Sequence, residues 1–170
     1  MVIKVGDVFP EVQLKYIPYD KENPDACAAP QILNTKKDFA GKKVVVVGVP
    51  GAFTPTCSTQ HIPAFVAKEA ELKAKDVDLI VCVSGNDFFV MSAWGKDMGV
   101  KNNIIMAGDA NGDLGRATGL ALDLAKVGLG SARLTRFAAI IDNGKVAHLA
   151  IEPDPSSVTV TGAENIIAAL

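Results

Sequence analysis

The chain has 170 residues, of which 49% are hydrophobic and 21% are charged, and its formal net charge is −2. These values predict one globular domain over residues 1–170, with a substantial core, and exclude an intrinsically disordered chain. The sequence shows no basic cluster and no apolar run near the ~20 residues that a membrane span needs. Neither nucleic acid nor a membrane is therefore an expected partner.

The compartment is predicted from the cysteines and the ends of the chain. Three cysteines, at positions 27, 57 and 82, are too few for a disulfide framework, and they fit a reducing compartment. The first residues lack the features of a signal or transit peptide, and the last ones fall short of the peroxisomal address. We expect a cytoplasmic protein, with the peroxisome and the mitochondrion left open.

The first half of the chain predicts a strand–helix–strand unit after an irregular start. Residues 1–40 carry turn signals, so short strands and a long excursion are expected there. The apolar run 44–49 predicts a buried central strand. Apolar residues at helical spacing predict a helix over residues 59–75, and a second apolar run predicts a strand over residues 77–83.

The second half of the chain also predicts strands that alternate with helices. A helix over residues 87–98 is expected to begin after Asn86 as its N-cap and to bury Val90 and Trp94. Further expectations are a strand at 104–107, a short helix at 114–120, strands at 137–141 and 146–150 around an Asp-Asn-Gly turn, and a helix at 162–170. This order predicts an α/β chain of thioredoxin-like fold, with an N-terminal extension and a central mixed sheet covered by helices on both faces.

Two lesser motifs predict no ligand. The segment from Asp109 to Asp113 begins like a calcium loop, but Leu114 and Leu120 stand where that loop needs Gly and Glu. We read it as a surface turn and expect no metal. The Gly-Leu-Gly of residues 128–130 is read as a flexible link, since the full dinucleotide-binding pattern is absent and no cofactor is expected.

Cys57 is the most informative residue, because it follows the predicted central strand and lies in the first turn of a helix. Free backbone N–H groups and the helix dipole stabilise an anion at such a place, and the thiolate is the nucleophilic form of cysteine. The alternative is a small buried cysteine that fills a gap in the core. A strand-to-helix corner is a poor place to hide a side chain, which favours a reactive thiol.

The residues around Cys57 resemble the peroxiredoxins, which are thiol peroxidases with a thioredoxin-like fold. The spacing Pro50-x-x-x-Thr54-x-x-Cys57 matches their peroxidatic-cysteine motif. The run from Val49 to Ser58, with His61-Ile-Pro after it, is similar to the type II, or type five, branch. The resemblance extends over nearly the whole chain, through Asn86-Asp-Phe-Phe-Val, Ala93-Trp-Gly, Arg136-Phe, Asn143-Gly-Lys and Glu152-Pro. Cys27 and its Ala-Ala-Pro-Gln context resemble fungal members.

The resemblance implies an activity and a set of partners. Cys57 would reduce hydrogen peroxide and small organic hydroperoxides and become a sulfenic acid, which another thiol must then resolve. Thioredoxin is the usual reductant, and glutaredoxin or glutathione is the alternative. A homodimer is the expected assembly.

Three residues before Cys57 are expected to shape its pocket. Thr54 can direct its hydroxyl at a bound peroxide, since a hydroxyl both donates and accepts hydrogen bonds. Pro50 has no N–H and can shield the sulfur without competing for hydrogen bonds. Gly51 is expected as an auxiliary pocket residue.

A cation and a histidine complete the expected site. The resemblance assigns to Arg136, directly before Phe137, the role of reaching both the thiolate and a peroxide oxygen, with Arg133 as its neighbour. From the residues alone, either arginine reads as a solvated charge at a strand edge. His61, one turn after Cys57, is read as auxiliary, and a partly exposed helix histidine is the alternative.

Three positions are considered for the resolving thiol. Val160 stands where animal members carry a cysteine near the C-terminus, so that route is closed. Cys82 matches a second cysteine of plant members, but it lies in an apolar strand and is read as an inert core thiol. Cys27 lies in a loop rich in Pro and Ala, where some fungal members carry a resolving cysteine. We expect a Cys27–Cys57 disulfide between two subunits, and a one-cysteine mechanism with an external thiol stays open.

Other functions fit the residues less well. A dithiol oxidoreductase needs Cys-x-x-Cys, and Thr54 occupies the first of those positions. A cysteine hydrolase needs a histidine that faces the sulfur from another element, and the chain has only His61 and His148. A non-enzymatic redox sensor or holdase stays an open alternative.

Overall fold

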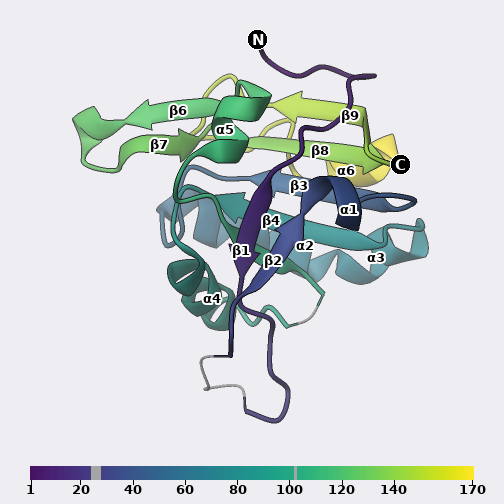
Figure 1. The fold of residues 1–170 in the computed structure, drawn as a ribbon, viewed down its shortest axis with the longest axis horizontal. Helices are drawn as coiled ribbons and strands as arrows, with labels where there is room; N and C mark the ends of the chain where they lie inside the picture. The colour runs from purple at the N-terminus through teal and green to yellow at the C-terminus, as the bar shows by residue number, and fades with distance from the viewer. Residues whose placement is uncertain (24–27, 102) are drawn as a thin grey trace.

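The computed structural model describes residues 1–23, 28–101 and 103–170. Seven strands form one sheet in the order β2-β1-β5-β4-β3-β8-β9, and β6 and β7 form a two-stranded sheet (Figure 1). The strands are β1 (Gln13–Tyr16), β2 (Gln31–Asn34), β3 (Lys43–Gly48), β4 (Leu79–Ser84), β5 (Ile105–Gly108), β6 (Ala121–Leu124), β7 (Gly130–Leu134), β8 (Phe137–Asp142) and β9 (Lys145–Ile151). The helices are α1 (Thr35–Asp38), α2 (Ile62–Ala67), α3 (Glu69–Ala74), α4 (Phe88–Asp97), α5 (Asp113–Thr118) and α6 (Ala163–Ala169), with a π-helical turn at Cys57–His61 and a 3-10 turn at Ala125–Val127.

The central strand β3 separates two cores. It pairs in parallel with β4 and antiparallel with β8, so the sheet is mixed as predicted. Val45 and Val47 belong to one buried cluster, with residues of α2, α3, α4 and α6, while Val44 and Val46 face a second cluster, with residues near α1 and α5. Figure 1 shows α1 and α5 in front of the sheet and α2 and α3 behind it. The alternation of side chains along a strand explains why this apolar run is buried on both faces.

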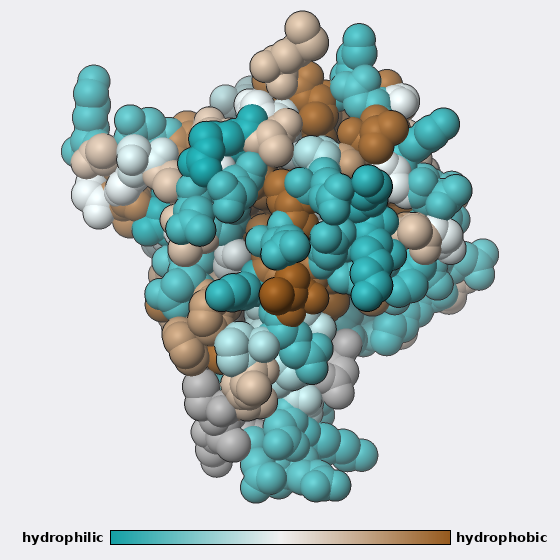
Figure 2. Space-filling view, in the orientation of Figure 1, coloured by the Kyte–Doolittle hydropathy of each residue, from teal (hydrophilic) through white to brown (hydrophobic). Residues whose placement is uncertain are grey.

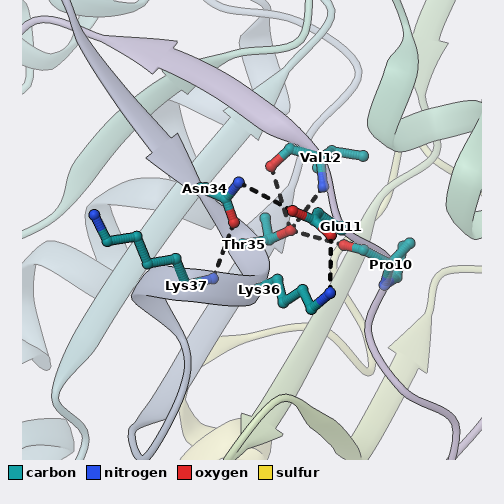
Figure 3. A network of polar contacts seen from close by, with 7 residues as sticks. All are labelled: Pro10, Glu11, Val12, Asn34, Thr35, Lys36 and Lys37. Carbon is teal, nitrogen blue, oxygen red and sulfur yellow. Dashed lines mark hydrogen bonds and ion pairs between the residues drawn. The ribbon is translucent and has the colours of Figure 1, made fainter.

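Two stretches of the N-terminal extension are joined through Thr35, at the start of α1. The Thr35 hydroxyl donates to the Pro10 carbonyl at 2.7 Å and accepts from the Val12 N–H at 2.9 Å (Figure 3). The Asn34 side chain caps the helix by accepting from the Lys37 N–H at 2.9 Å. In Figure 2 this side of the molecule is mostly hydrophilic, with hydrophobic side chains in small groups.

The predicted helix over residues 59–75 is wrong as a single helix. Helical residues begin at Pro55, the turn Cys57–His61 is π-helical, and Lys68 (φ −99°, ψ 7°) separates α2 from α3. The Ile62 N–H donates to the Cys57 carbonyl, five residues back, which widens the turn. Pro63 has no N–H to donate to the carbonyl four residues before it, so a regular helix cannot continue through this turn.

The start of α4 also differs from the prediction. Asp87, not Asn86, is the N-cap, and its carboxylate accepts from the N–H groups of Phe89 and Val90. Trp94 is buried as predicted, whereas Val90 is only half-buried. The Asn86 side chain is used elsewhere, in contacts with the segment before Cys57. Both residues are common N-cap types, so the sequence alone did not separate them.

The β6–β7 hairpin was not predicted. Of the stretch 128–130, read as a flexible link, Gly128 and Leu129 lie in its turn and Gly130 begins β7. Gly128 and Gly130 have φ values of 80° and 87°. Both strands are short, and Leu134 is their only buried residue, so their apolar pattern was too weak to predict a hairpin. The one hairpin that was predicted, β8–β9, is confirmed, and Asn143 (φ 47°) and Gly144 (φ 78°) connect its two strands. No helix among the described residues has the length and apolar character needed to cross a membrane.

Candidate active site

Cys57 lies where the sequence predicted, after β3 and in the first turn of a helical segment. The Ser58 N–H donates to the Thr54 carbonyl at 3.0 Å, and the N–H groups of Thr56 and Cys57 precede that bond at the helix start. Cys57 is fully buried, with 0% of its surface exposed, and it belongs to a core cluster, so the expectation that this corner would not hide a side chain is wrong. Its sulfur therefore interacts with protein groups, and their identity decides what it can do.

Arg136 supplies the cation beside the sulfur. Its Nη2 donates to Cys57 Sγ at 3.3 Å, and its guanidinium is buried, with 1% of the residue exposed. The register of β3 and β8 pairs Gly48 with Phe137, so the residue before Phe137 lies beside the chain that follows Gly48. A buried cation is costly unless other groups accept its remaining N–H bonds, and two such groups are present. Its Nε donates to the Pro155 carbonyl and its Nη1 to His61, both at 3.0 Å.

His61 contacts Arg136 directly and is fully buried, so the alternative of a partly exposed helix histidine is wrong. Its Nδ1 accepts from Arg136 Nη1, and its Nε2 donates to the Thr161 carbonyl at 3.0 Å, which assigns the proton to Nε2. Burial is the main cause that lowers the pKa of His61 to about 4, and the Arg136 charge lowers it further, against the opposing effect of the Thr161 bond. The ring is therefore neutral near pH 7 and accepts a bond from the arginine.

The segment before Cys57 is held by its own hydrogen bonds. Pro50 and Gly51 are buried, and the Thr54 hydroxyl donates to the Gly51 carbonyl at 2.8 Å. A side chain on Gly51 would lie 3.1 Å from Arg133 Nη1, so a residue without a Cβ fits this position best. The structure thus brings Pro50, Gly51 and Thr54 together at the entrance of the Cys57 turn.

The two arginines occupy different places. Arg133 Nη1 donates to Asn86 Oδ1 at 2.9 Å and to the Pro50 carbonyl at 3.4 Å. Asn86 Oδ1 also accepts from the Ala52 N–H at 2.9 Å. Arg133 and Asn86 therefore hold the segment before Cys57, while Arg136 contacts the sulfur.

Sequence reasoning missed the segment 153–161 and the carboxylate that holds it. Glu152 is 3% exposed and accepts hydrogen bonds from Thr159, Val160 and Thr161. Burial acts to raise the pKa of Glu152, but these bonds outweigh it and lower that pKa to about 2. The only signal in the sequence was Glu152-Pro within the family resemblance, because no local pattern shows that a glutamate will meet residues seven to nine positions later.

Of the other two cysteines, Cys82 and Cys27, only Cys82 lies within the described residues. Cys82 is buried in β4 and shares a core cluster with Cys57. Burial, with a smaller contribution from Cys57, raises the pKa of the Cys82 thiol well above its usual range, which fits an inert core thiol. Cys27 lies outside the described residues.

Comparisons with known proteins place this geometry in a family. Residues 4–167 match the Redoxin family. The chain is 45% identical to peroxiredoxin-2C of Oryza sativa subsp. japonica, over 99% of this chain and 98% of that one. It is 38% identical to peroxiredoxin Pen c 3 of Penicillium citrinum, over 100% of both chains, so the comparisons do not single out the fungal members. The structure of reduced Prx3 of Vibrio vulnificus in complex with H2O2 superposes with a TM-score of 0.86, at 42% identity over 99% of both chains.

Proposed function

The chain belongs to the Redoxin family and, within it, to the peroxiredoxins, and we propose that Cys57 is its peroxidatic nucleophile. It is a thiol-dependent peroxidase. The observation that carries the residue assignment is the 3.3 Å contact between Arg136 Nη2 and Cys57 Sγ in a buried site. A buried guanidinium beside a sulfur favours the thiolate over the thiol, and the thiolate is the form that attacks peroxide.

The first step converts the thiolate to a sulfenic acid. The Cys57 thiolate attacks the terminal oxygen of a hydroperoxide, an S–O bond forms as the O–O bond breaks, and the departing alkoxide or hydroxide takes up a proton. Arg136 and the N–H groups at the helix start stabilise the charge that develops on the oxygens. The Thr54 hydroxyl lies in the same segment and can exchange its bond to Gly51 for one to the peroxide. Pro50 has no N–H, so it can shield the sulfur without competing for hydrogen bonds.

The second step returns the sulfur to its reduced form. The Cys27 thiol of a partner subunit attacks the Cys57 sulfenic acid, a disulfide forms and water leaves. A thioredoxin dithiol then reduces this disulfide and is itself oxidised. Glutaredoxin or glutathione, attacking the sulfenic acid directly, is the alternative that needs no second cysteine.

The sheet topology supports resolution across two subunits. Tyr16, at the end of β1, is level with Gly48 across the sheet, and β1 runs opposite to β5, β4 and β3. Residues 17–20 consequently continue toward the starts of the central strands, where they share a cleft with Leu79 and Ile104. Cys57 follows the other end of β3. The chain that leads to Cys27 thus leaves the sheet away from the Cys57 of its own subunit.

The proposed homodimer is supported by exposed aromatic rings next to the Cys57 segment. Phe53 and Phe89 are 54% and 53% exposed. The bond from the Ala52 N–H to Asn86 Oδ1 joins the segment that carries Phe53 to the start of α4, which carries Phe89. Exposed aromatic rings favour a protein–protein contact. For the compartment we retain the cytoplasm as a proposal, which cell fractionation tests.

Replacement of each cysteine tests this function. Cys57→Ser should abolish thioredoxin-coupled peroxide consumption, while Cys82→Ser should retain it. A Cys57→Ser enzyme with a tenth of wild-type turnover would remove Cys57 from the nucleophile role. The same assay separates an enzyme from a non-enzymatic sensor or holdase.

Non-reducing gels test the resolving step. After one equivalent of peroxide, the wild type should form a covalent dimer, and Cys27→Ser should stay monomeric and accumulate sulfenic or sulfinic acid. A monomer with a Cys27–Cys57 peptide would contradict the intersubunit geometry, and a monomer without it would favour the one-cysteine mechanism.

A further inference from the structure

The segment 153–161 covers the Cys57 site and contacts it through three backbone carbonyls. The Pro155 carbonyl accepts from Arg136 Nε at 3.0 Å, and the Thr161 carbonyl accepts from His61 Nε2 at 3.0 Å. The Ser156 carbonyl accepts from the Thr56 hydroxyl at 2.8 Å. Arg136 contacts Cys57 Sγ, His61 contacts Arg136, and Thr56 is the residue before Cys57. The position of this segment therefore decides how the site is arranged.

One carboxylate holds the end of that segment. Glu152 Oε1 accepts from the N–H groups of Thr159, Val160 and Thr161 at 2.7, 2.8 and 2.9 Å, and from the Thr161 hydroxyl at 2.9 Å. Its Oε2 accepts from the Thr159 hydroxyl at 2.6 Å. Three consecutive backbone N–H groups converge on one ionised oxygen, and such charge-assisted bonds are short and strong.

The hydrogen bonds of Glu152 lead to the sulfur in an unbroken series. Thr161 donates to Glu152 and accepts from His61, and His61 accepts from Arg136 Nη1. Arg136 then donates to Cys57 Sγ through Nη2. The Glu152 N–H also donates to the Arg136 carbonyl at 3.0 Å, so the carboxylate and the arginine are anchored to each other through the backbone.

We propose that Glu152 is a positioning residue for peroxide reduction: by ordering residues 159–161 it sets the orientation of His61 and Arg136, and through them the guanidinium that contacts Cys57. This inference rests on the proposed role of Cys57. Glu152 acts through its hydrogen bonds, because both of its oxygens accept from residues 159–161. The low pKa of Glu152 agrees with this use of its lone pairs.

The test compares substitutions that remove or keep the acceptor oxygen. In Glu152→Ala all five bonds are lost, whereas the amide oxygen of Glu152→Gln can still accept from the three backbone N–H groups. Glu164→Gln is the matched control, since it removes the same charge from an exposed residue of α6. All variants carry Cys27→Ser and Cys82→Ser, so that only Cys57 reacts.

Two readouts follow the site. The first is the rate constant of Cys57 oxidation by H2O2, followed in stopped flow by the fluorescence of Trp94. This is the only tryptophan of the chain, and its Nε1 donates to the Ser58 hydroxyl at 3.0 Å. The second is the pH profile of Cys57 alkylation by iodoacetamide, which needs no peroxidase activity. If the wild type failed to consume peroxide, the proposed function would fail, while the alkylation profiles would still test the role of Glu152.

We expect Glu152→Ala to slow oxidation by about 10- to 100-fold, the scale of a ~1 Å misplacement at a reacting centre. Its alkylation profile should shift to higher pH, because the guanidinium is no longer held at the sulfur. Glu152→Gln and Glu164→Gln should stay within about threefold of wild type, well inside that scale. A folded Glu152→Ala protein with wild-type rate and profile overturns the proposal. A Glu152→Gln protein as impaired as Glu152→Ala overturns it too, since charge and not hydrogen bonding would then matter.

A milder pair of variants applies if Glu152→Ala does not fold. Thr159→Val and Thr161→Val each remove one hydroxyl donor to Glu152 and keep the backbone bonds. Thr161→Val should slow oxidation more than Thr159→Val, because only residue 161 also holds His61 through its carbonyl. Equal rates in both variants and the wild type overturn the proposal.

Discussion

Lowering the pH should destabilise the protein through a single histidine, His61, in a defined window. Burial, followed by the Arg136 charge, lowers the pKa of His61 to about 4 in the folded state, from 6.5 as its ordinary value. Between these two values the unfolded chain binds a proton that the folded chain does not. The unfolded state therefore gains free energy from protonation, and stability is lost as the pH falls from 6.5 toward 4.

The magnitude follows from the size of the shift. One pKa unit corresponds to about 1.4 kcal/mol, so the full shift is worth roughly 3 kcal/mol, of which about 2 kcal/mol falls between pH 7 and pH 4.5. Glu152 contributes in a separate window, because its pKa is lowered to about 2 from 4.5. Its contribution is nearly complete above about pH 5 and is lost progressively as the pH falls from about 4.5 to about 2.

Urea unfolding at pH 7, 5.5 and 4.5, followed by Trp94 fluorescence and circular dichroism, measures this effect. The His61→Gln protein should be less stable than wild type at pH 7, yet should lose about 2 kcal/mol less on going to pH 4.5, since no imidazole titrates at this position. His148→Gln, on the edge strand β9, is the matched control at the other histidine. If His61→Gln and wild type lose the same free energy over this range, His61 is not neutral and buried as described.

The remaining predictions concern the arginines, the core thiol and the hairpin. Arg136→Ala should slow Cys57 oxidation by about 100-fold, the scale of losing one preorganised electrostatic group, and Arg133→Ala by less, because it contacts Pro50 and Asn86 instead of the sulfur. The reverse order in stopped flow would transfer the role to Arg133. Cys82→Ser should retain peroxidase activity and lose about 1–3 kcal/mol of stability in urea unfolding, because a hydroxyl enters the core; loss of activity in a folded protein would refute an inert thiol. Gly85→Ala should cost about 1–3 kcal/mol or more, since the added Cβ would lie 2.0 Å from the Ala132 carbonyl oxygen, and unchanged stability would contradict this packing of β7.

Local pattern was enough to predict most of the sheet and the place of Cys57. The run 44–49 contributed residues 44–48 to β3, because four consecutive valines at 44–47 favour a strand that is buried on both faces. The Asp-Asn-Gly turn became the β8–β9 connection because Asn and Gly tolerate positive φ. The prediction of one continuous helix over residues 59–75 failed, because apolar spacing and a proline gave conflicting signals there. Pro63 and the π-helical turn interrupted a helix that the apolar spacing alone made continuous.

The sequence by itself determined that a cysteine follows a buried strand at the start of a helix, since strand, turn and helix signals all act over a few residues. Only the tertiary structure decided what surrounds its sulfur. Arg136 lies 79 positions from Cys57 and 75 from His61, and His61 lies 100 positions from Thr161. The β3–β8 register places Arg136, and not Arg133, beside the Cys57 segment. The segment held by Glu152 accepts a hydrogen bond from His61 Nε2, which leaves Nδ1 as the acceptor for Arg136. No local periodicity encodes these contacts, because they depend on how strands pair and how a distant segment folds back over them.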